Sequence, residues 1–262
     1  MRRYLRILRA PRLGRLLAAS LPARLPMGIN GLALVLLLRA ETGSFGVAGA
    51  AAGALALGSG AGAPLGGRLI DRLGPRVMLV QAVVHATGLV ALIVLAEAAA
   101  PAAAIVATAL VCGAAFPTTS SVLRVQYPRL LGDDPGLLHG AFALDSVLTE
   151  SVFTVGPLLT AALVVVLGPA AALAFSAASV LAGTVALVAA LPAADAVARG
   201  AGGGLGALAA PGIRTLIGAM LPVGFSFGML EVALPAFAQE HGRPGLAGVL
   251  VALWSIGSAT AM

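Results

Sequence analysis

The chain has 262 residues, of which 60% are hydrophobic and 10% are charged, and its mean hydropathy is +1.03. Soluble globular proteins carry about 25% charged residues, so this composition excludes an ordinary soluble domain and indicates an integral membrane protein. The formal net charge of +6 comes from arginines scattered along the chain, without the concentrated basic face of a nucleic-acid-binding protein, so we expect no nucleic-acid partner.

The chain opens with a basic segment, because residues 1–15 contain six arginines. A basic start before an apolar run is also typical of a secretory signal. Here the apolar run continues to Leu38 and lacks a convincing small-residue cleavage site. We therefore expect this segment to be an uncleaved lead into a first membrane span.

Apolar segments of membrane length recur along the whole chain. A helix satisfies its backbone hydrogen bonds internally, so a run of about 20 apolar residues is expected to cross the bilayer as an α-helix. The sequence predicts eight such spans, at approximately 16–38, 45–65, 77–97, 102–122, 140–167, 169–191, 213–238 and 246–262. The expected fold class is therefore an all-α, polytopic membrane protein with its lipid bilayer as a partner.

The second span carries small residues at four-residue spacing, namely Ala54, Gly58, Gly62 and Gly66. Small residues at this spacing share one helix face and let two helices approach closely in lipid. We interpret the stripe as a surface for tight packing. A surface along which the helices slide past each other is the alternative.

A short charged stretch separates the second and third spans. The sequence GGRLIDRLGPR, at 66–76, places Gly67, Asp71, Arg72, Gly74 and Arg76 between two segments that carry almost no charge. We expect a charged loop at one membrane face. In the third span Gln81 and His85 are four residues apart, and we expect His85 to be a hydrogen-bonded core histidine.

Three acidic residues fall inside predicted spans: Asp145 and Glu150 in the fifth and Glu231 in the seventh. A buried acidic group costs several kcal/mol unless it is protonated, paired or facing water, so each is a candidate functional residue. In one interpretation Glu150 exchanges protons or binds a cationic group. In the other, Arg24 of the first span pairs with Glu150 or Asp145 as a structural ion pair.

Glu231 shares a helical face with Gly224, Gly228 and Pro235. This pattern suggests a locally weakened helix near a polar site, because interrupted helices bind substrate in transporters. Glycine and proline are also common in membrane helices generally, which leaves a purely structural interpretation open.

The composition changes at 192–211, which is rich in alanine and glycine. We interpret this stretch as a flexible cytoplasmic linker. It divides the chain into a six-helix bundle at 1–191 and a pair of helices at 212–262.

The arginines are distributed unevenly between the loops on the two sides of the membrane. Thirteen lie at the N-terminus and in the loops that share its side, whereas Arg39 and Arg243 lie on the other side and Arg24 lies inside the first span. Because arginine accumulates in cytoplasmic loops, the N-terminus is predicted to be cytoplasmic.

The charged stretch resembles the signature loop of the major facilitator superfamily, roughly G-x-L-x-D-R-x-G-R-R. Leu69 and the five residues named above fall in register with it, whereas Pro75 stands where the family usually has a basic residue. Gly156 and Pro157 in the fifth span resemble the Gly-Pro of the family's antiporter motif, and we expect a helix kink there.

This resemblance implies a secondary active transporter of small molecules, in which two six-helix bundles alternate about a site near the membrane midplane. It implies a proton-linked exporter in a bacterial plasma membrane. It also implies a gating role for the charged loop and for Arg124, which lies on the same side. Arg24, Asp145, Glu150 and Glu231 are then the candidates for substrate binding or proton coupling.

The family fold requires twelve spans, so we expect a chain truncated after its eighth helix, with the first two helices of a second bundle. Residues 1–262 would then not transport by themselves, and the helices at 212–262 would be loosely placed on the six-helix bundle. This leaves open a non-transporting fragment or a regulatory membrane subunit. No hydrolase, metalloprotease or Cys/His pattern and no phosphate-binding loop occurs in the sequence, so we expect no enzyme, metal or cofactor.

Overall fold

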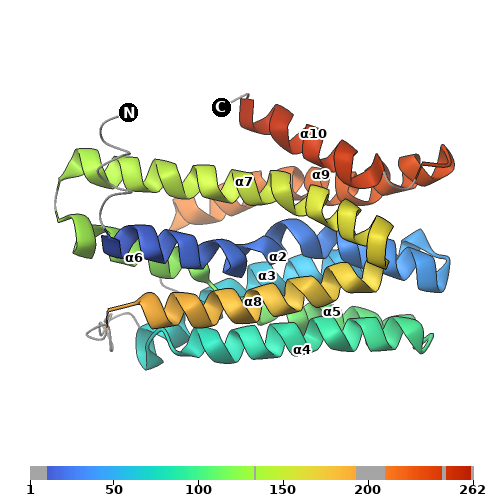
Figure 1. The fold of residues 1–262 in the computed structure, drawn as a ribbon, viewed down its shortest axis with the longest axis horizontal. Helices are drawn as coiled ribbons and strands as arrows, with labels where there is room; N and C mark the ends of the chain where they lie inside the picture. Colours follow the sequence, from blue (N-terminus) through green and yellow to red (C-terminus); the bar gives the residue numbers. More distant parts are fainter. Residues whose placement is uncertain (1–10, 133, 193–209, 244–245, 261–262) are drawn as a thin grey trace.

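The computed structural model describes residues 11–132, 134–192, 210–243 and 246–260. In these ranges the chain is helical throughout, with no strand, and its helices run roughly side by side (Figure 1). They are α2 (Pro11–Thr42), α3 (Phe45–Leu73), α4 (Val77–Glu97), α5 (Ala102–Ala114), α6 (Thr119–Leu131), α7 (Pro135–Leu167), α8 (Pro169–Ala190), α9 (Pro211–Glu240) and α10 (Leu246–Thr260). The predicted linker and the first ten residues lie largely outside the described ranges.

Among the residues that the structure describes, seven segments are long and apolar enough to cross a membrane. Six are the single helices α2, α3, α4, α7, α8 and α9, and the seventh is the α5–α6 pair, while α10 is a shorter apolar helix. Large apolar side chains such as Leu57, Val80 and Val166 are exposed on the outside of the bundle. Such a surface suits lipid and not water. The all-α, multi-pass membrane architecture predicted from the sequence is therefore confirmed.

The fourth predicted span is not one continuous helix, so that prediction was wrong in detail. α5 ends at Ala114 and α6 begins at Thr119, with Pro117 between them. Proline lacks the backbone N–H that would continue the helix, and it disfavours helical backbone at the preceding residue, here Phe116. Together α5 and α6 form one candidate span, which extends from Ala102 to Leu131, beyond the predicted end at 122.

The charged stretch between the second and third spans is mostly helical, which corrects the predicted loop. α3 continues to Leu73, so Gly67, Asp71 and Arg72 lie in its last turns. Gly74 ends the helix with φ of +87°, a left-handed conformation that glycine adopts without strain. The turn between α3 and α4 is therefore very short.

α2 lies at the centre of the bundle and packs against α3, α7 and α8. Residues 28–38 of this helix are almost all buried, with Ile29, Leu34 and Leu38 fully inaccessible. These side chains join apolar residues of α3, α4, α5 and α8 in the largest core cluster. α2 is thus the scaffold on which the other helices are placed.

The glycine stripe of α3 packs tightly, as predicted, and the helix it packs against is α5. A side chain added at Gly58 or Gly62 would collide with the α5 backbone between Leu110 and Ala114. In return, Gly113 of α5 lies against the backbone of α3 near Leu55. Close helix approach explains these small residues, and a sliding role stays a prediction.

A second close approach joins α2 to α7, where Gly28 and Gly156 face each other. A Cβ added at Gly156 would lie 2.6–2.8 Å from the backbone of Gly28. Figure 1 shows the yellow, C-terminal part of α7 inclined to its green, N-terminal part, as expected for a helix with Pro157 inside it. The predicted kink and the helix crossing therefore coincide.

We expect Gly156→Ala to destabilise the protein by about 1–3 kcal/mol, because the added methyl group must separate two backbones. Gly53→Ala is the matched control, since a Cβ at Gly53 meets nothing within 4 Å. The control should leave stability unchanged or raise it by up to about 1 kcal/mol through helix propensity. Thermal unfolding in detergent measures both, and equal melting temperatures for the two variants would contradict the close crossing.

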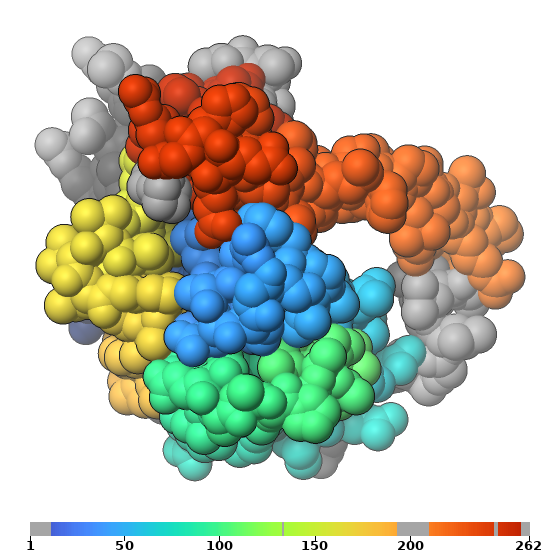
Figure 2. Space-filling model, turned by 90° about the vertical axis from the view of Figure 1, so that its right-hand side faces the viewer, coloured from blue at the N-terminus to red at the C-terminus, as the bar shows by residue number. Residues whose placement is uncertain are grey.

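α9 and α10 differ in how closely they pack, although both were expected to be loosely placed. Residues 214–229 of α9 are exposed, and Figure 2 shows this orange helix standing apart from the rest of the bundle along part of its length. By contrast, α10 packs along α7, with Gly248 against Pro157 and Ala161. The expectation is wrong for α10, because small residues on both helices permit close contact.

Successive spans cross the bundle in opposite directions, which separates the arginines between its two ends (Figure 1). One end carries the arginines at the starts of α2 and α9, near the α3–α4 turn and in α6. They are Arg12, Arg15, Arg68, Arg72, Arg76, Arg124, Arg129 and Arg214. The other end receives Arg39 and Arg243. The described part of the chain thus has the charge asymmetry of a membrane protein with a defined orientation.

Candidate functional site

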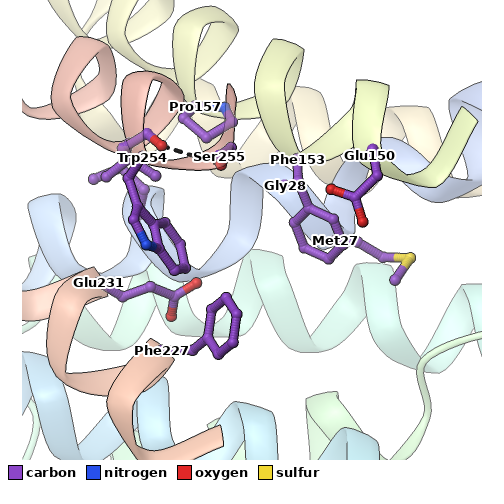
Figure 3. Close-up of a pocket in the computed structure, with 11 residues that line it drawn as sticks. Met27, Gly28, Glu150, Phe153, Pro157, Phe227, Glu231, Trp254 and Ser255 are labelled. Atoms are coloured by element: carbon purple, nitrogen blue, oxygen red, sulfur yellow. Dashed lines mark hydrogen bonds between the residues drawn. The ribbon is translucent and has the colours of Figure 1, made fainter. Parts of the chain in front are cut away.

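A cavity of about 370 Å³ lies between α2, α7, α9 and α10 (Figure 3). This size falls within the range of about 300–1,000 Å³ that is typical of small-molecule sites. Eleven residues line it: Met27, Gly28, Leu32, Glu150, Phe153, Pro157, Phe227, Glu231, Val251, Trp254 and Ser255. We call it the carboxylate cavity, because two of the acidic residues singled out from the sequence face it.

The crossing of α2 and α7 shapes one wall of this cavity. Gly28 and Pro157, which belong to the crossing, are part of the lining. One turn further along α2, Gly31 leaves room for the side chain of Glu231, whose two carboxylate oxygens would lie 2.7 Å from a Cβ at that position. The carboxylate of Glu231 therefore rests against the backbone of α2.

Glu150 and Glu231 enter the cavity from opposite sides, from α7 and α9 (Figure 3). Neither carboxylate has a hydrogen-bond or ion-pair partner within the described ranges of the chain. No basic side chain is among the described residues that line the cavity. Two acidic groups in an otherwise apolar site within the bundle need a proton, a cation or water to be stable.

Aromatic side chains surround these carboxylates, which the sequence alone did not predict. Phe227 lies one helical turn before Glu231 on α9, and its ring meets the indole of Trp254 edge to face, with 4.7 Å between the ring centroids. Phe153 lies near Glu150 in the same view (Figure 3). Aromatic residues are ordinary in apolar spans, so no pattern distinguished these three.

The predicted weakening of the helix around Glu231 is not observed, since α9 is helical without interruption from Pro211 to Glu240. Gly224 and Gly228 face open space, because a Cβ at either would meet nothing within 4 Å. Pro235 is buried inside the helix. Membrane helices tolerate such residues where neighbouring groups supply the packing.

A separate polar cluster lies nearer the N-terminal end of α2, centred on Asp145 of α7. Arg24 and Asp145 form an ion pair, and each side chain is only 1% exposed. Arg24 also donates to the hydroxyl of Thr149 at 3.0 Å. Of the two partners that the sequence left open for Arg24, the structure thus has Asp145 and not Glu150.

α6 contributes two further groups to Asp145. The phenol of Tyr127 donates to the carboxylate at 2.9 Å, and Arg124 Nε lies 3.4 Å from its other oxygen. Arg124 is 58% exposed, so its interaction is screened, unlike that of Arg24. Together these contacts tie α2, α6 and α7 to one another. The role of Tyr127 was not predicted, because it depends on the break between α5 and α6.

The residues of the charged stretch do not join either cluster. Asp71, Arg72 and Arg76 are exposed at the end of α3 and the start of α4. Arg124, which was expected to be available to Asp71, contacts Asp145 instead. The predicted site residues therefore lie in three places: the carboxylate cavity, the Asp145 cluster and the α3–α4 turn.

His85 is a buried core histidine, as predicted, with a partner at each ring nitrogen. Its Nδ1 lies 2.8 Å from the carbonyl oxygen of Cys112, and its Nε2 lies 3.0 Å from the side-chain nitrogen of Asn30. The oxygen of that amide accepts from Ser176 at 2.5 Å. One neutral tautomer, with the proton on Nδ1, satisfies all these groups.

Comparison with protein-family models finds none that matches the chain, and comparison with curated proteins finds no relative. The functional assignment therefore depends on the sequence motifs and on the geometry described above.

Proposed function

We propose that the protein is a secondary active transporter that carries small molecules through the carboxylate cavity by alternating access. It works as a proton-linked exporter of a bacterial plasma membrane and belongs to the major facilitator superfamily. The observation that carries this proposal is the cavity itself, a ligand-sized space inside a membrane bundle with two carboxylates that have no partner among the described residues. Intramembrane acidic groups facing a cavity mark ion and substrate pathways.

The packing divides the cavity walls into a fixed part and a movable part. The Gly28–Gly156 crossing and the Arg24–Asp145 pair hold α2 and α7 together. Across the cavity, α9 contributes Phe227 and Glu231, and much of this helix makes little contact with the bundle. Movement of α9 against the wall that α2, α7 and α10 form would open the cavity to one membrane face or the other.

Protonation supplies the energetic coupling in this proposal. Glu150 takes up a proton when the cavity faces one side and releases it on the other, in exchange for substrate. A proton shifts the conformational equilibrium only if it binds the two states with different affinity. A carboxylate without a fixed cationic partner meets this condition, because its surroundings change as the walls move.

The charge asymmetry supports an orientation with the N-terminus and the α3–α4 turn in the cytoplasm. Asp71, Arg72 and Arg76 then act at the cytoplasmic face, in the gating role that the family resemblance implies. Arg124, which contacts the Asp145 cluster, lies at the same end and connects that face to the buried pair.

One observation favours a second candidate, a non-transporting membrane subunit derived from such a transporter. Residues 215–226 of α9 are exposed, which leaves a long helical surface on the outside of the described bundle. Such a surface would suit association with another membrane protein.

Cysteine accessibility tests alternating access directly. Cys112 is the single native cysteine, so Cys112→Ala gives a background for Phe153→Cys inside the cavity and Arg72→Cys at the α3–α4 turn. With the protein in lipid vesicles, we expect a membrane-impermeant thiol reagent to reach position 153 from one face, and inversion of the pH gradient to change that face. Position 72 should react from the cytoplasmic face only. The proposal would be refuted if the labelling of position 153 did not change with the pH gradient, or if position 72 were labelled from outside.

A further inference from the structure

We propose that the carboxylate cavity selects organic cations, which bind between Glu231 and Glu150 with their apolar parts against Phe227, Trp254 and Phe153. This inference rests on the proposed function and names the substrate class of that same site. It is carried by the charge, the aromatic lining and the volume of the cavity.

Charge balance is the first argument. Both ends of the cavity carry a carboxylate, and the described lining contributes no arginine or histidine to neutralise them. The Asp145 cluster provides the contrast, since there the carboxylate is paired with Arg24 and Arg124. A cationic ligand supplies in the cavity the positive charge that the protein supplies at Asp145, whereas an anion would be repelled at both ends.

The aromatic lining is the second argument. Phe227 and Glu231 are four residues apart, so ring and carboxylate lie on the same face of α9. Trp254 of α10 meets that ring at an interplanar angle of 61°. Figure 3 shows the carboxylate of Glu231 beside the ring of Phe227, with the indole of Trp254 on the same side of the cavity. Tryptophan and phenylalanine rings attract organic cations through their π faces.

The same lining does not suit a metal ion. Ca²⁺ takes about six to eight oxygen ligands, and Mg²⁺ about six. The described lining offers two carboxylates and the hydroxyl of Ser255, which donates to the carbonyl of Val251 at 3.1 Å. Most of the remaining lining is apolar, including Met27, Leu32 and Val251. An organic cation uses both the charge and this apolar surface.

The single tryptophan of the chain is Trp254, so its fluorescence reports on the cavity alone. We would titrate the purified 262-residue chain in detergent with tetraphenylphosphonium, and with tetraphenylborate as an anion of the same shape. We expect a saturable change in Trp254 emission with the cation, and no saturable change with the anion. This comparison needs no variant and therefore does not depend on how a variant folds.

Three variants locate the binding site. Glu231→Gln and Glu150→Gln should each weaken tetraphenylphosphonium binding by roughly tenfold or more, because each removes one of two charges that face the ligand. Glu97→Gln is the matched control, since Glu97 is exposed at the end of α4, and its binding should equal that of the unchanged chain. Equal binding of cation and anion, or equal affinity in all three variants, would overturn the assignment.

The outcomes also separate this inference from the proposed function. Suppose that tetraphenylphosphonium does not bind although the protein shows gradient-driven flux of another compound. In that case the proposed substrate class is wrong and the proposed transport function is retained. If the cation binds with the expected dependence on Glu231 but no flux occurs, the proposed ligand class is correct and the proposed transport function is wrong.

Discussion

Replacing Asp145 by asparagine should lower the free energy of unfolding by about 3–5 kcal/mol, the largest stability loss we expect in this protein. The change leaves the guanidinium of Arg24, which is only 1% exposed, without its counter-charge. The hydroxyl of Thr149 still accepts from Arg24, but a neutral acceptor does not balance a buried charge.

The reciprocal change, Arg24→Met, should destabilise the protein less. Asp145 keeps the phenol of Tyr127 and the partly exposed guanidinium of Arg124, so its charge remains compensated. The double variant Arg24→Met/Asp145→Asn should be more stable than Asp145→Asn alone, because no uncompensated charge is then buried. Arg124→Gln is the control for a screened surface interaction and should change stability by about 1 kcal/mol or less.

Thermal unfolding of these four variants in detergent forms a double-mutant cycle with one control. A double variant at least as unstable as the sum of the two single changes would show that Arg24 and Asp145 are not coupled. The result also concerns function, because the proposed fixed wall of the cavity depends on this pair holding α2 to α7.

The second large effect concerns flux. We expect Glu150→Gln in the protein reconstituted in lipid vesicles to reduce transport driven by a pH gradient to the level of protein-free vesicles. Glutamine has nearly the shape of glutamate, but its side chain cannot take up and release the coupling proton. Proton coupling is therefore lost while the bundle remains intact. Exchange of substrate between the two sides at equal concentration does not need the proton and should persist.

Glu97→Gln makes the same chemical change away from the cavity and should retain gradient-driven transport. If Glu150→Gln also retained uphill transport, Glu150 would be part of the lining and not the coupling residue. In that case Glu231 would be the next carboxylate to test, since it is the other unpartnered acidic group of the cavity.

The sequence predicted the class of the molecule because membrane helices need long apolar runs, and these are visible without a structure. It also predicted that Arg24 has a buried acidic partner. It left Asp145 and Glu150 as equal candidates, because the choice depends on the register between α2 and α7. The crossing at Gly28 and Gly156 sets that register and brings Arg24 level with Asp145.

Other features depended on contacts between distant segments and could not be predicted. Glycines indicated close packing, but which helix approaches Gly58 is decided by the tertiary fold. Phe227 and Trp254 are ordinary residues of apolar spans until α9 and α10 bring them together beside Glu231. The boundaries of the charged stretch were misplaced because α3 continues until Gly74 ends it.

The most direct test of the central claim is a flux measurement on the protein in lipid vesicles, with and without an imposed pH gradient. We expect saturable transport that requires the gradient, reverses when the gradient is inverted, and stops when an ionophore abolishes it. A complete lack of gradient-dependent flux from correctly folded, correctly oriented protein would contradict the account and would favour a membrane subunit that binds small molecules without transporting them.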